Sequence, residues 1–198
     1  PLLARLVLDP ELELPADTAA PAVPEPAHGV TLLASRLTGP PGRLKGIDPS
    51  HVRFLASLWP LVLVEADGSR RLPLKAPAEY EPVVPAETAL TVGVLGLDAL
   101  GWPMDERTVH RPERFAAVTG CDPGAAIGWD HLVALARHPE GLFKGARGAR
   151  VALLNKVDES SYLPSPGQLR ALGADLVLLS GADEEERAFY TIPPGTSR

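Results

Sequence analysis

The chain has very little cysteine and no long apolar run, and these absences exclude several classes of protein. Cys121 is the only cysteine among 198 residues, so no disulfide can form within the chain. No set of cysteines and histidines has the spacing of a structural zinc site. The longest apolar runs fall well short of the roughly eighteen residues that a membrane-spanning helix needs, and no signal-peptide pattern is visible. We therefore expect a cytoplasmic protein without a membrane-spanning segment.

The sequence also lacks an excess of positive charge. Lysine and arginine total 19 against 25 aspartates and glutamates, which gives a formal net charge of −6 and argues against nucleic acid as a partner. Hydrophobic and charged fractions of 45% and 22% are those of an ordinary globular protein, whose length suits one domain. By contrast, 22 prolines and 18 glycines are many. They predict short elements joined by many loops, although a heat-adapted or high-GC source would give the same excess.

The alternation of apolar and polar stretches predicts the order of secondary structure. Asp48 is a good N-cap, and Pro49 suits a first helical position. Strands are predicted at 29–37, 61–66, 89–97, 150–155 and 175–179, helices at 49–59, 112–118, 130–137 and 166–172, a strand or helix remnant at 2–8 and a loop at 15–28. This order predicts an α/β fold: a single domain over 1–198 with a mainly parallel sheet, helices on both faces and a small helical insertion at 98–148.

The stretch 61–75, LVLVEADGSRRLPLK, leads an apolar run directly into several charged side chains. The run predicts a buried strand, and ligands of open α/β sheets bind at the carboxyl ends of strands. Asp67 is therefore a candidate to hold Mg²⁺, and Glu65, on the same face of the strand, could share metal binding or activate water. Glu65 could instead pair with Arg70 or Arg71. An ordinary core strand that ends in a solvated turn would show the same pattern.

Three cationic side chains after this strand suit the binding of phosphate. Arg70 and Arg71 offer a bidentate fork, and Lys75 offers a point charge. A solvated basic loop would account for any one of them equally well. Asp98 follows the next predicted strand, where it could face the same cleft or cap the turn at Gly101.

A further strand end, VALLNKVD at 151–158, has the Asn-Lys-x-Asp spacing of the guanine-reading motif of GTP-binding proteins. Asp158 can accept two parallel N–H bonds from the edge of guanine, which adenine does not offer. The stem of Lys156 can lie over the base, and Asn155 can bond the base or nearby loops. Ser180 begins a Ser-Gly-Ala segment where GTPases place a backbone contact to the base, although Ser-Gly is also a routine turn.

Four segments together resemble the YqeC family, accessory proteins of selenium-dependent molybdenum hydroxylases. They are RLKGIDPSHV (43–52), VLVEADGSRRLPLKAPAEYEPVVP (62–85), TVGVLGLDALGWPMDERTVHRPERFAAVTG (91–120) and HPEGLFKGARGARVALLNKVD (138–158), and they cover over half of the chain in order. The resemblance implies a nucleotide-binding fold of the P-loop NTPase type. It also implies a role in maturing the molybdenum cofactor of such hydroxylases.

The Gly-rich phosphate loop that is typical of the YqeC family does not occur in this sequence. No G-x-x-x-x-G-K-[ST] is present, and Gly29 is the first glycine. Either the sequence omits the N-terminal strand, loop and helix, or the protein has lost them. The backbone N–H cradle for phosphates is then missing from these residues as well.

The histidines and the cysteine have more than one possible role. His110, in the segment HRPE, could be a general acid, a cofactor ligand or a buried hydrogen-bonding residue, and Pro112 favours a helix start there. His131 and His138 flank one predicted helix, which favours surface or packing roles. Cys121 could attack selenium or sulfur as a thiolate, but nothing near it in the sequence indicates activation, which favours an inert packing residue.

These interpretations predict a nucleotide-dependent accessory factor in the maturation of a selenium-dependent molybdenum hydroxylase. The motifs predict GTP or ATP and Mg²⁺ as cofactors, and the resemblance implies the molybdenum cofactor as substrate and the hydroxylase or cofactor-maturation proteins as partners. Hydrolysis of the nucleotide and nucleotidyl transfer are both open as activities. The alternative is a binding or scaffold protein that delivers the molybdenum cofactor without turning over nucleotide.

Overall fold

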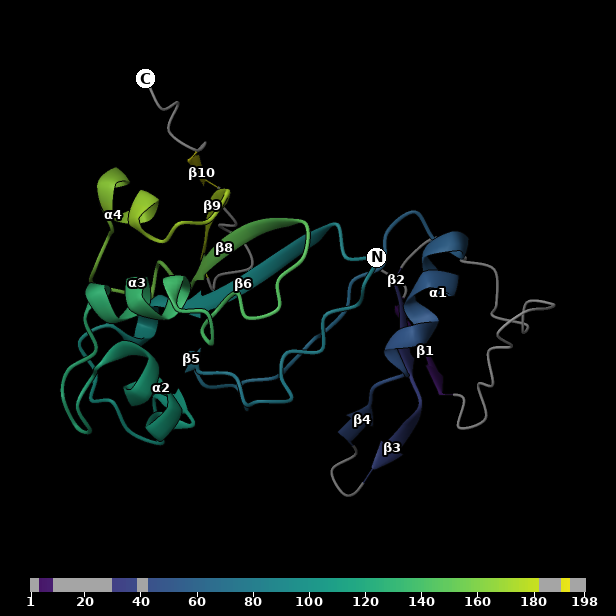
Figure 1. Ribbon diagram of the computed structural model, residues 1–198, viewed down its shortest axis with the longest axis horizontal. Coiled ribbons are helices and arrows are strands. Elements are labelled where there is room, and N and C mark those ends of the chain that lie inside the picture. Colours follow the sequence, from purple (N-terminus) through teal and green to yellow (C-terminus); the bar gives the residue numbers. More distant parts are fainter. Residues whose placement is uncertain (1–3, 9–29, 39–42, 182–189, 193–198) are drawn as a thin grey trace. The chain divides into compact units, whose positions relative to one another are not determined.

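The computed structural model describes residues 4–8, 30–38, 43–181 and 190–192, and the chain divides into two compact units (Figure 1). Unit 1 is Pro1–Val64 and unit 2 is Glu65–Arg198. Each unit is described by itself, and the prediction of a single domain over 1–198 stays a prediction. The loop predicted at 15–28 lies outside the described residues.

Unit 1 contains two small sheets and one helix. The elements are β1 (Ala4–Leu8), β2 (Val30–Ala34), β3 (Arg36–Thr38), β4 (Arg43–Lys45), the 3-10 turn η1 (Pro49–His51) and α1 (Val52–Leu58). β1 pairs with β2 in parallel and β3 with β4 antiparallel, so the strand predicted at 29–37 is divided at Ser35. Asp48 caps the turn as predicted, because its carboxylate accepts from the Ser50 N–H at 2.9 Å. The helix ends before Trp59, which precedes a proline and is extended.

The strand predicted at 61–66 is absent, and this prediction is wrong. The segment belongs to no sheet among the described strands. Leu61 and Leu63 are 72% and 84% exposed. At the end of the segment, the Val83 N–H donates a hydrogen bond to the Ala66 carbonyl at 3.2 Å. An apolar run becomes a buried strand only where neighbouring strands bond its backbone, and none of the described strands lies beside this run.

Unit 2 is built on a four-stranded sheet with the order β10-β9-β8-β6. The strands β6 (Leu90–Gly96), β8 (Ala149–Asn155) and β9 (Leu176–Ser180) are parallel, and β10 (Tyr190–Ile192) is antiparallel to β9. The strands predicted at 89–97, 150–155 and 175–179 are therefore confirmed. β10 was not predicted, since three residues are too few to show a period.

Three helices and a pair of very short strands complete unit 2. The helices are α2 (Pro112–Thr119), α3 (Trp129–Arg137) and α4 (Pro166–Ala171), as predicted, and the 3-10 turn η2 (Leu97–Ala99) follows β6. β5 (Leu74–Lys75) pairs in parallel with β7 (Val109–His110). Gly120 after α2 has φ 72°, a left-handed conformation that favours glycine at the end of a helix. None of the described helices is long and apolar enough to cross a membrane.

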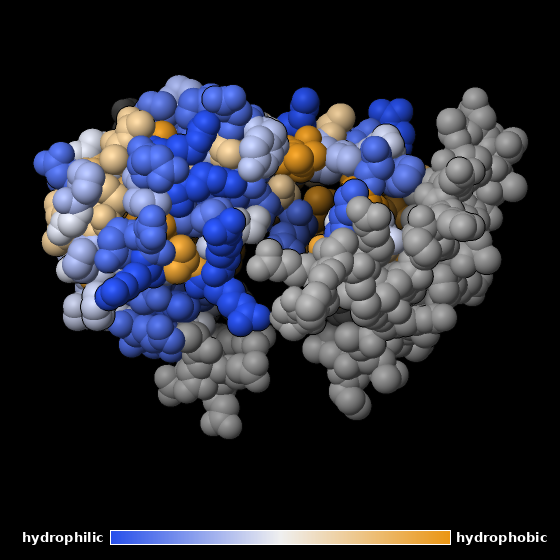
Figure 2. All heavy atoms as spheres, turned by 90° about the horizontal axis from the view of Figure 1, so that it is seen from below, coloured by the Kyte–Doolittle hydropathy of each residue, from blue (hydrophilic) through white to orange (hydrophobic). Residues whose placement is uncertain are grey.

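The described helices of unit 2 pack on one face of the sheet. Phe115 of α2, Leu132 of α3 and Leu169 of α4 share one buried cluster with Leu95 and Leu154 of the sheet. Strand side chains alternate, so Leu90, Val92 and Val94 of β6 lie on the opposite face, where they are 51%, 46% and 52% exposed. The view in Figure 2 is mostly hydrophilic, with small apolar patches. The prediction of helices on both faces is therefore confirmed for one face of this sheet. The remaining helix, α1, belongs to unit 1.

Candidate functional site

The first candidate site, the strand-end site, lies at the carboxyl ends of β8 and β9. Asn155 is the last residue of β8 and is in register with Ser180, the last residue of β9. A Cβ at Gly181 would lie 3.3 Å from the carboxyl carbon of Asp158, so this carboxylate lies against the Ser-Gly backbone. The predicted base-reading residues Asn155, Lys156, Asp158 and Ser180 therefore gather at one edge of the sheet.

Lys156 at this edge is held by Asp98, which follows β6. The ammonium of Lys156 donates to Oδ2 of Asp98 at 2.8 Å, and this hydrogen bond raises the pKa of Lys156. Asp98 thus contacts a residue at the strand ends, while the cleft shared with Asp67 stays a prediction. The other oxygen, Oδ1, is buried without a hydrogen-bond partner in the part of the chain that the structure describes. Such an atom costs about 1–3 kcal/mol, so a donor from water or a ligand would stabilise it.

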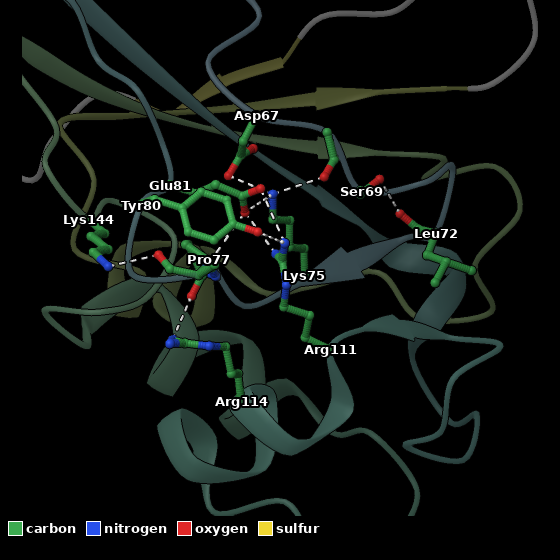
Figure 3. A network of polar contacts seen from close by, with 12 residues as sticks. Asp67, Ser69, Leu72, Lys75, Pro77, Tyr80, Glu81, Arg111, Arg114 and Lys144 are labelled. Carbon is green, nitrogen blue, oxygen red and sulfur yellow. Dashed lines mark hydrogen bonds and ion pairs between the residues drawn. The ribbon is translucent and has the colours of Figure 1, made fainter. Parts of the chain in front are cut away.

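The second candidate site is an ion-pair cluster around Lys75 and Glu81, the Lys75 cluster (Figure 3). Nζ of Lys75 lies 2.9 Å from Asp67 Oδ2 and 2.6 Å from Glu81 Oε2, and it donates to the Gly68 carbonyl at 2.9 Å. Arg111 binds Glu81 through both terminal nitrogens, at 2.7 and 3.2 Å. The side chains of Lys75 and Glu81 are only 8% and 17% exposed. The cluster therefore forms in a partly desolvated setting, where charge-assisted hydrogen bonds are strong.

The two cations of the Lys75 cluster come from paired strands, whereas Glu81 comes from an irregular segment. The pairing of β5 with β7 places Lys75 in register with His110, and Arg111 follows as the N-cap residue of α2. Glu81 lies between residues 76 and 89, which form no helix or strand.

The pKa values in this cluster follow from burial and from the neighbouring charges. Burial by itself would raise the pKa of Glu81, but hydrogen bonds from Arg111 and Lys75 outweigh it and bring the pKa to about 2. Desolvation, together with the cations Arg111, Arg70 and Lys75, lowers the pKa of His110. At neutral pH Glu81 is therefore ionised and His110 is uncharged, so the imidazole can accept or donate a hydrogen bond.

Two further cations hold the backbone next to Glu81 (Figure 3). Lys144 donates to the Ala78 carbonyl at 2.9 Å and to the Glu79 carbonyl at 3.2 Å. Arg114 donates to the Pro77 carbonyl at 3.2 Å. These bonds satisfy carbonyl groups that no sheet or helix pairs, and they connect an irregular segment to the helical part of unit 2.

Every residue other than glycine with a left-handed backbone is an arginine or a lysine, as far as the structure describes the chain. They are Arg70, Arg71, Arg111 and Lys156, with φ of 56°, 66°, 66° and 59°. This conformation costs about 1–2 kcal/mol per residue, and such residues concentrate at functional sites. Arg111 belongs to the Lys75 cluster and Lys156 to the strand-end site.

The predicted pair of carboxylates, Asp67 and Glu65, is not joined by any contact recorded among the described residues. Glu65 is exposed, and Asp67 bonds Lys75 instead. No group of three or more His, Cys, Asp or Glu that could hold a metal ion occurs within the described ranges. Mg²⁺ often takes one or two carboxylates and completes its shell with water and phosphate. Asp67 fits only that kind of site, and its role in binding magnesium stays a prediction.

The sequence reasoning did not select Glu81 or Arg111 as site residues, although both hold the centre of the Lys75 cluster. Each of them directly precedes a proline, Pro82 and Pro112. A following proline restricts the backbone of the residue before it and so limits where its side chain can point. A charged residue also precedes a proline at Asp9, Glu25, Asp48 and Asp122, so this pattern alone does not single out Glu81 and Arg111.

The surface or packing roles predicted for His131 and His138 agree with the structure, in which His138 is exposed and both rings bond nearby backbone. Nδ1 of His131 accepts from the Gly128 N–H at 2.9 Å, at the start of α3. Nδ1 of His138 accepts from the Glu140 N–H at 3.1 Å, just after that helix. Both rings thus satisfy local backbone donors at the ends of one helix.

Cys121 is buried, with 1% of its surface exposed. Burial, together with the charge of Asp122, raises the pKa of its thiol, so little thiolate forms at neutral pH. We expect the folded protein to react with a disulfide reagent such as DTNB much more slowly than the denatured protein does. A folded protein that reacted as fast as the denatured one would contradict an inert packing role for Cys121.

The fold and the two sites define an α/β protein with charged strand ends, and sequence comparisons give its family. The family profile described as "YqeC protein" matches residues 7–113, more than half of the chain. The chain belongs to the YqeC family, which confirms the resemblance noted in the sequence. The Uncharacterized protein YqeC of Escherichia coli (strain K12) is 41% identical over 105 residues, which are 52% of this chain and 41% of that relative, so the chain spans about two fifths of its length. No solved structure matches the chain.

Only one of the two candidate sites lies within the residues that match the family profile. The matched residues 7–113 include Lys75, Glu81 and Arg111. Asn155, Lys156 and Asp158 lie beyond the matched range. The Lys75 cluster is therefore part of the segment that defines the family, and the strand-end site rests on its own geometry.

Proposed function

We propose that this chain acts in the cytoplasm as a nucleotide-dependent accessory factor in the maturation of a selenium-dependent molybdenum hydroxylase, and that it binds a guanine base at the strand-end site. One observation carries the nucleotide part. The carboxylate of Asp158 lies against Gly181 at the carboxyl edge of the sheet, next to Asn155 and Ser180, which are in register. This is the edge where open α/β sheets bind ligands. The hydroxylase and the molybdenum cofactor as cargo rest on the family resemblance.

The side chains at this edge suit guanine better than adenine. Asp158 is exposed and would accept the two adjacent N–H groups of guanine, which adenine does not present. Lys156 is oriented by its bond to Asp98, so its stem is ordered before a base arrives. Asn155 adds a donor and an acceptor at the same level of the sheet.

The phosphates of the nucleotide would be bound by groups other than these base-reading residues. Asp67 would supply one oxygen to a Mg²⁺ ion, which offsets phosphate charge when it is bound. Arg70 is exposed, and the described ion pairs of Asp67 and Glu81 are with Lys75 and Arg111. Arg70 is therefore better suited than Lys75 to contact the phosphates. Lys75 already donates to three acceptors.

Replacing Asp158 with asparagine is expected to remove the preference for guanine. A hydrogen bond to a charged acceptor contributes about 1.5–3 kcal/mol, so affinity for a fluorescent GTP analogue should fall about tenfold to a hundredfold. Affinity for the matching ATP analogue should change little. Titrations followed by fluorescence, with and without Mg²⁺, measure both affinities.

Glu159→Gln is the matched control for this titration. It removes the same charge at the next residue, where the carboxylate is 50% exposed and 3.9 Å from Lys156. The control should bind GTP as the unaltered chain does. Equal affinity of the unaltered chain for both analogues would refute the guanine site. An absence of saturable binding would refute the nucleotide proposal and favour the alternative of a non-catalytic scaffold.

A further inference from the structure

Glu81 lies between two cations in the arrangement that proteins use to bind anionic ligands. Arg111 offers it a bidentate fork, with bonds of 2.7 and 3.2 Å, and Lys75 approaches the same carboxylate to 2.6 Å. An arginine fork with a lysine beside it is a common way to hold a phosphate or a carboxylate. The ligand position is occupied here by a side chain of the protein itself.

We propose that Lys75 and Arg111 form a binding site for the phosphate group of a small ligand, and that Glu81 is an internal occupant which this ligand displaces. The proposal goes beyond guanine binding, because it needs no base and none of the strand-end residues. It assigns a specific role to two largely buried charges of the segment that matches the family.

The backbone around the two cations differs from the backbone around Glu81, and this difference favours displacement of Glu81 by a ligand. Lys75 lies on β5 and Arg111 directly follows β7, and these strands pair with each other. Glu81 lies in the irregular segment, where its neighbours Glu79 and Tyr80 are 90% and 74% exposed. One cation thus lies on a paired strand and the other directly follows one, whereas the anion lies in a loop beyond the carbonyls that Lys144 and Arg114 hold, next to exposed side chains.

The balance of charge favours a phosphate over a carboxylate as the incoming ligand. Lys75 and Arg111 bond the acidic side chains Asp67 and Glu81, and Arg70 is a third cation, near enough to lower the pKa of His110. The cations therefore exceed the carboxylates by one, and by two once Glu81 has left. A dianionic phosphate matches that excess, whereas a carboxylate brings one charge only.

His110 supplies a further group that responds to an anion. It is in register with Lys75, and its imidazole is kept neutral by desolvation and by the neighbouring cations. A dianion beside it would favour the protonated ring, which can then donate a hydrogen bond to a phosphate oxygen. Glu81 itself raises the pKa of His110, so a dianion that replaces this single carboxylate should raise the pKa further. The titration of His110 thus reports occupancy in the unaltered chain.

Glu81→Gln is expected to bind inorganic phosphate about tenfold more tightly than the unaltered chain, because the competing carboxylate is gone while glutamine still fits the space. Isothermal titration calorimetry at constant ionic strength measures both affinities, with acetate as the monoanionic comparison. Glu79→Gln is the matched control, since it removes the same charge from an exposed carboxylate two residues away. Adding Arg111→Gln to Glu81→Gln should abolish the gain.

Two results would overturn the proposal. Equal affinity of Glu81→Gln and Glu79→Gln for phosphate would show that the cluster is a structural ion pair only. If Glu81→Gln does not fold, the second measurement is the pKa of His110 in the unaltered chain, followed by NMR. This pKa should rise with added phosphate and not with added acetate. No rise with phosphate would refute the site. Neither readout involves Asp158, so a failure here is distinct from a failure of guanine binding.

Discussion

Replacing Lys75 with methionine is expected to lower the free energy of unfolding by about 3–5 kcal/mol, the cost of removing one partner from a buried ion pair. The ammonium of Lys75 bonds two carboxylates and a carbonyl, and its side chain is 8% exposed. Methionine fills similar volume, so the loss would come from Asp67 and Glu81, which would be left close together with less compensation. Urea denaturation followed by circular dichroism measures the change.

Arg150→Met is the control for this substitution, since it also replaces a cation by methionine. Arg150 lies 3.9 Å from Asp175 and is 46% exposed, so its loss should cost less than about 1 kcal/mol. Equal effects of the two substitutions would show that the Lys75 cluster behaves as an ordinary surface ion pair.

The same cluster makes stability depend on pH in the acid range. The pKa of Glu81 is held at about 2, below its usual value of 4.5. A lowered pKa means that the folded state binds the proton less readily, so the stabilisation is complete above about pH 4.5 and is lost as the pH falls toward about 2. The contribution of Glu81 over this interval is about 3 kcal/mol. Glu81→Gln should flatten this part of the stability profile, and a profile as steep as that of the unaltered chain would contradict the assignment.

Replacing Gly148 with alanine is expected to cost about 2–4 kcal/mol, the sum of left-handed backbone strain and overpacking. Gly148 has φ 62°, and a Cβ there would lie 1.9 Å from the Ala89 carbonyl oxygen. That oxygen accepts the hydrogen bond from the Ala149 N–H, at 3.0 Å, where β6 and β8 begin to pair. The added methyl group would therefore push apart the start of the β6–β8 strand pair. Thermal unfolding of the variant, compared with the unaltered chain, measures the loss.

Gly145→Ala separates the two causes of this loss. Gly145 has φ 65°, almost the same conformation, but nothing lies within 4 Å of a Cβ at this position. The control should show the backbone strain alone, about 1–2 kcal/mol. If both variants lost the same stability, crowding against Ala89 would have no part in the effect.

Much of unit 2 could be predicted from the sequence, because its signals are local. Pro112 at the start and Gly120 at the end bound α2 as predicted. The apolar runs that became β8 and β9 lead directly into Asn155 and Ser180, so the composition of the strand-end site was visible before its geometry. Parallel strands end at one edge of a sheet, which is why residues 25 positions apart in the sequence came to lie in register.

The stretch 61–75 shows where local signals fail. Its apolar half has the composition of a buried strand, yet Leu63 is 84% exposed, because a strand also requires partners that no local pattern specifies. Its charged half was predicted to bind phosphate and metal ions, which stays a prediction, and the structure shows that its lysine bonds Asp67 and Glu81. The sequence placed the right residue types at this site but did not show which of them pair.

The sequence by itself therefore determined the three long strands and the helices of unit 2, the family, and the residue types at the strand ends, since these depend on period, capping and motif spacing. Only the tertiary structure decided that Arg111 reaches Glu81 across thirty residues of chain, and that Asp98 orients Lys156 across fifty-eight. Both pairs join segments that are brought together by the strand pairings β5 with β7 and β6 with β8. Charge pairing of this kind depends on distance in space, and distance along the chain carries no record of it.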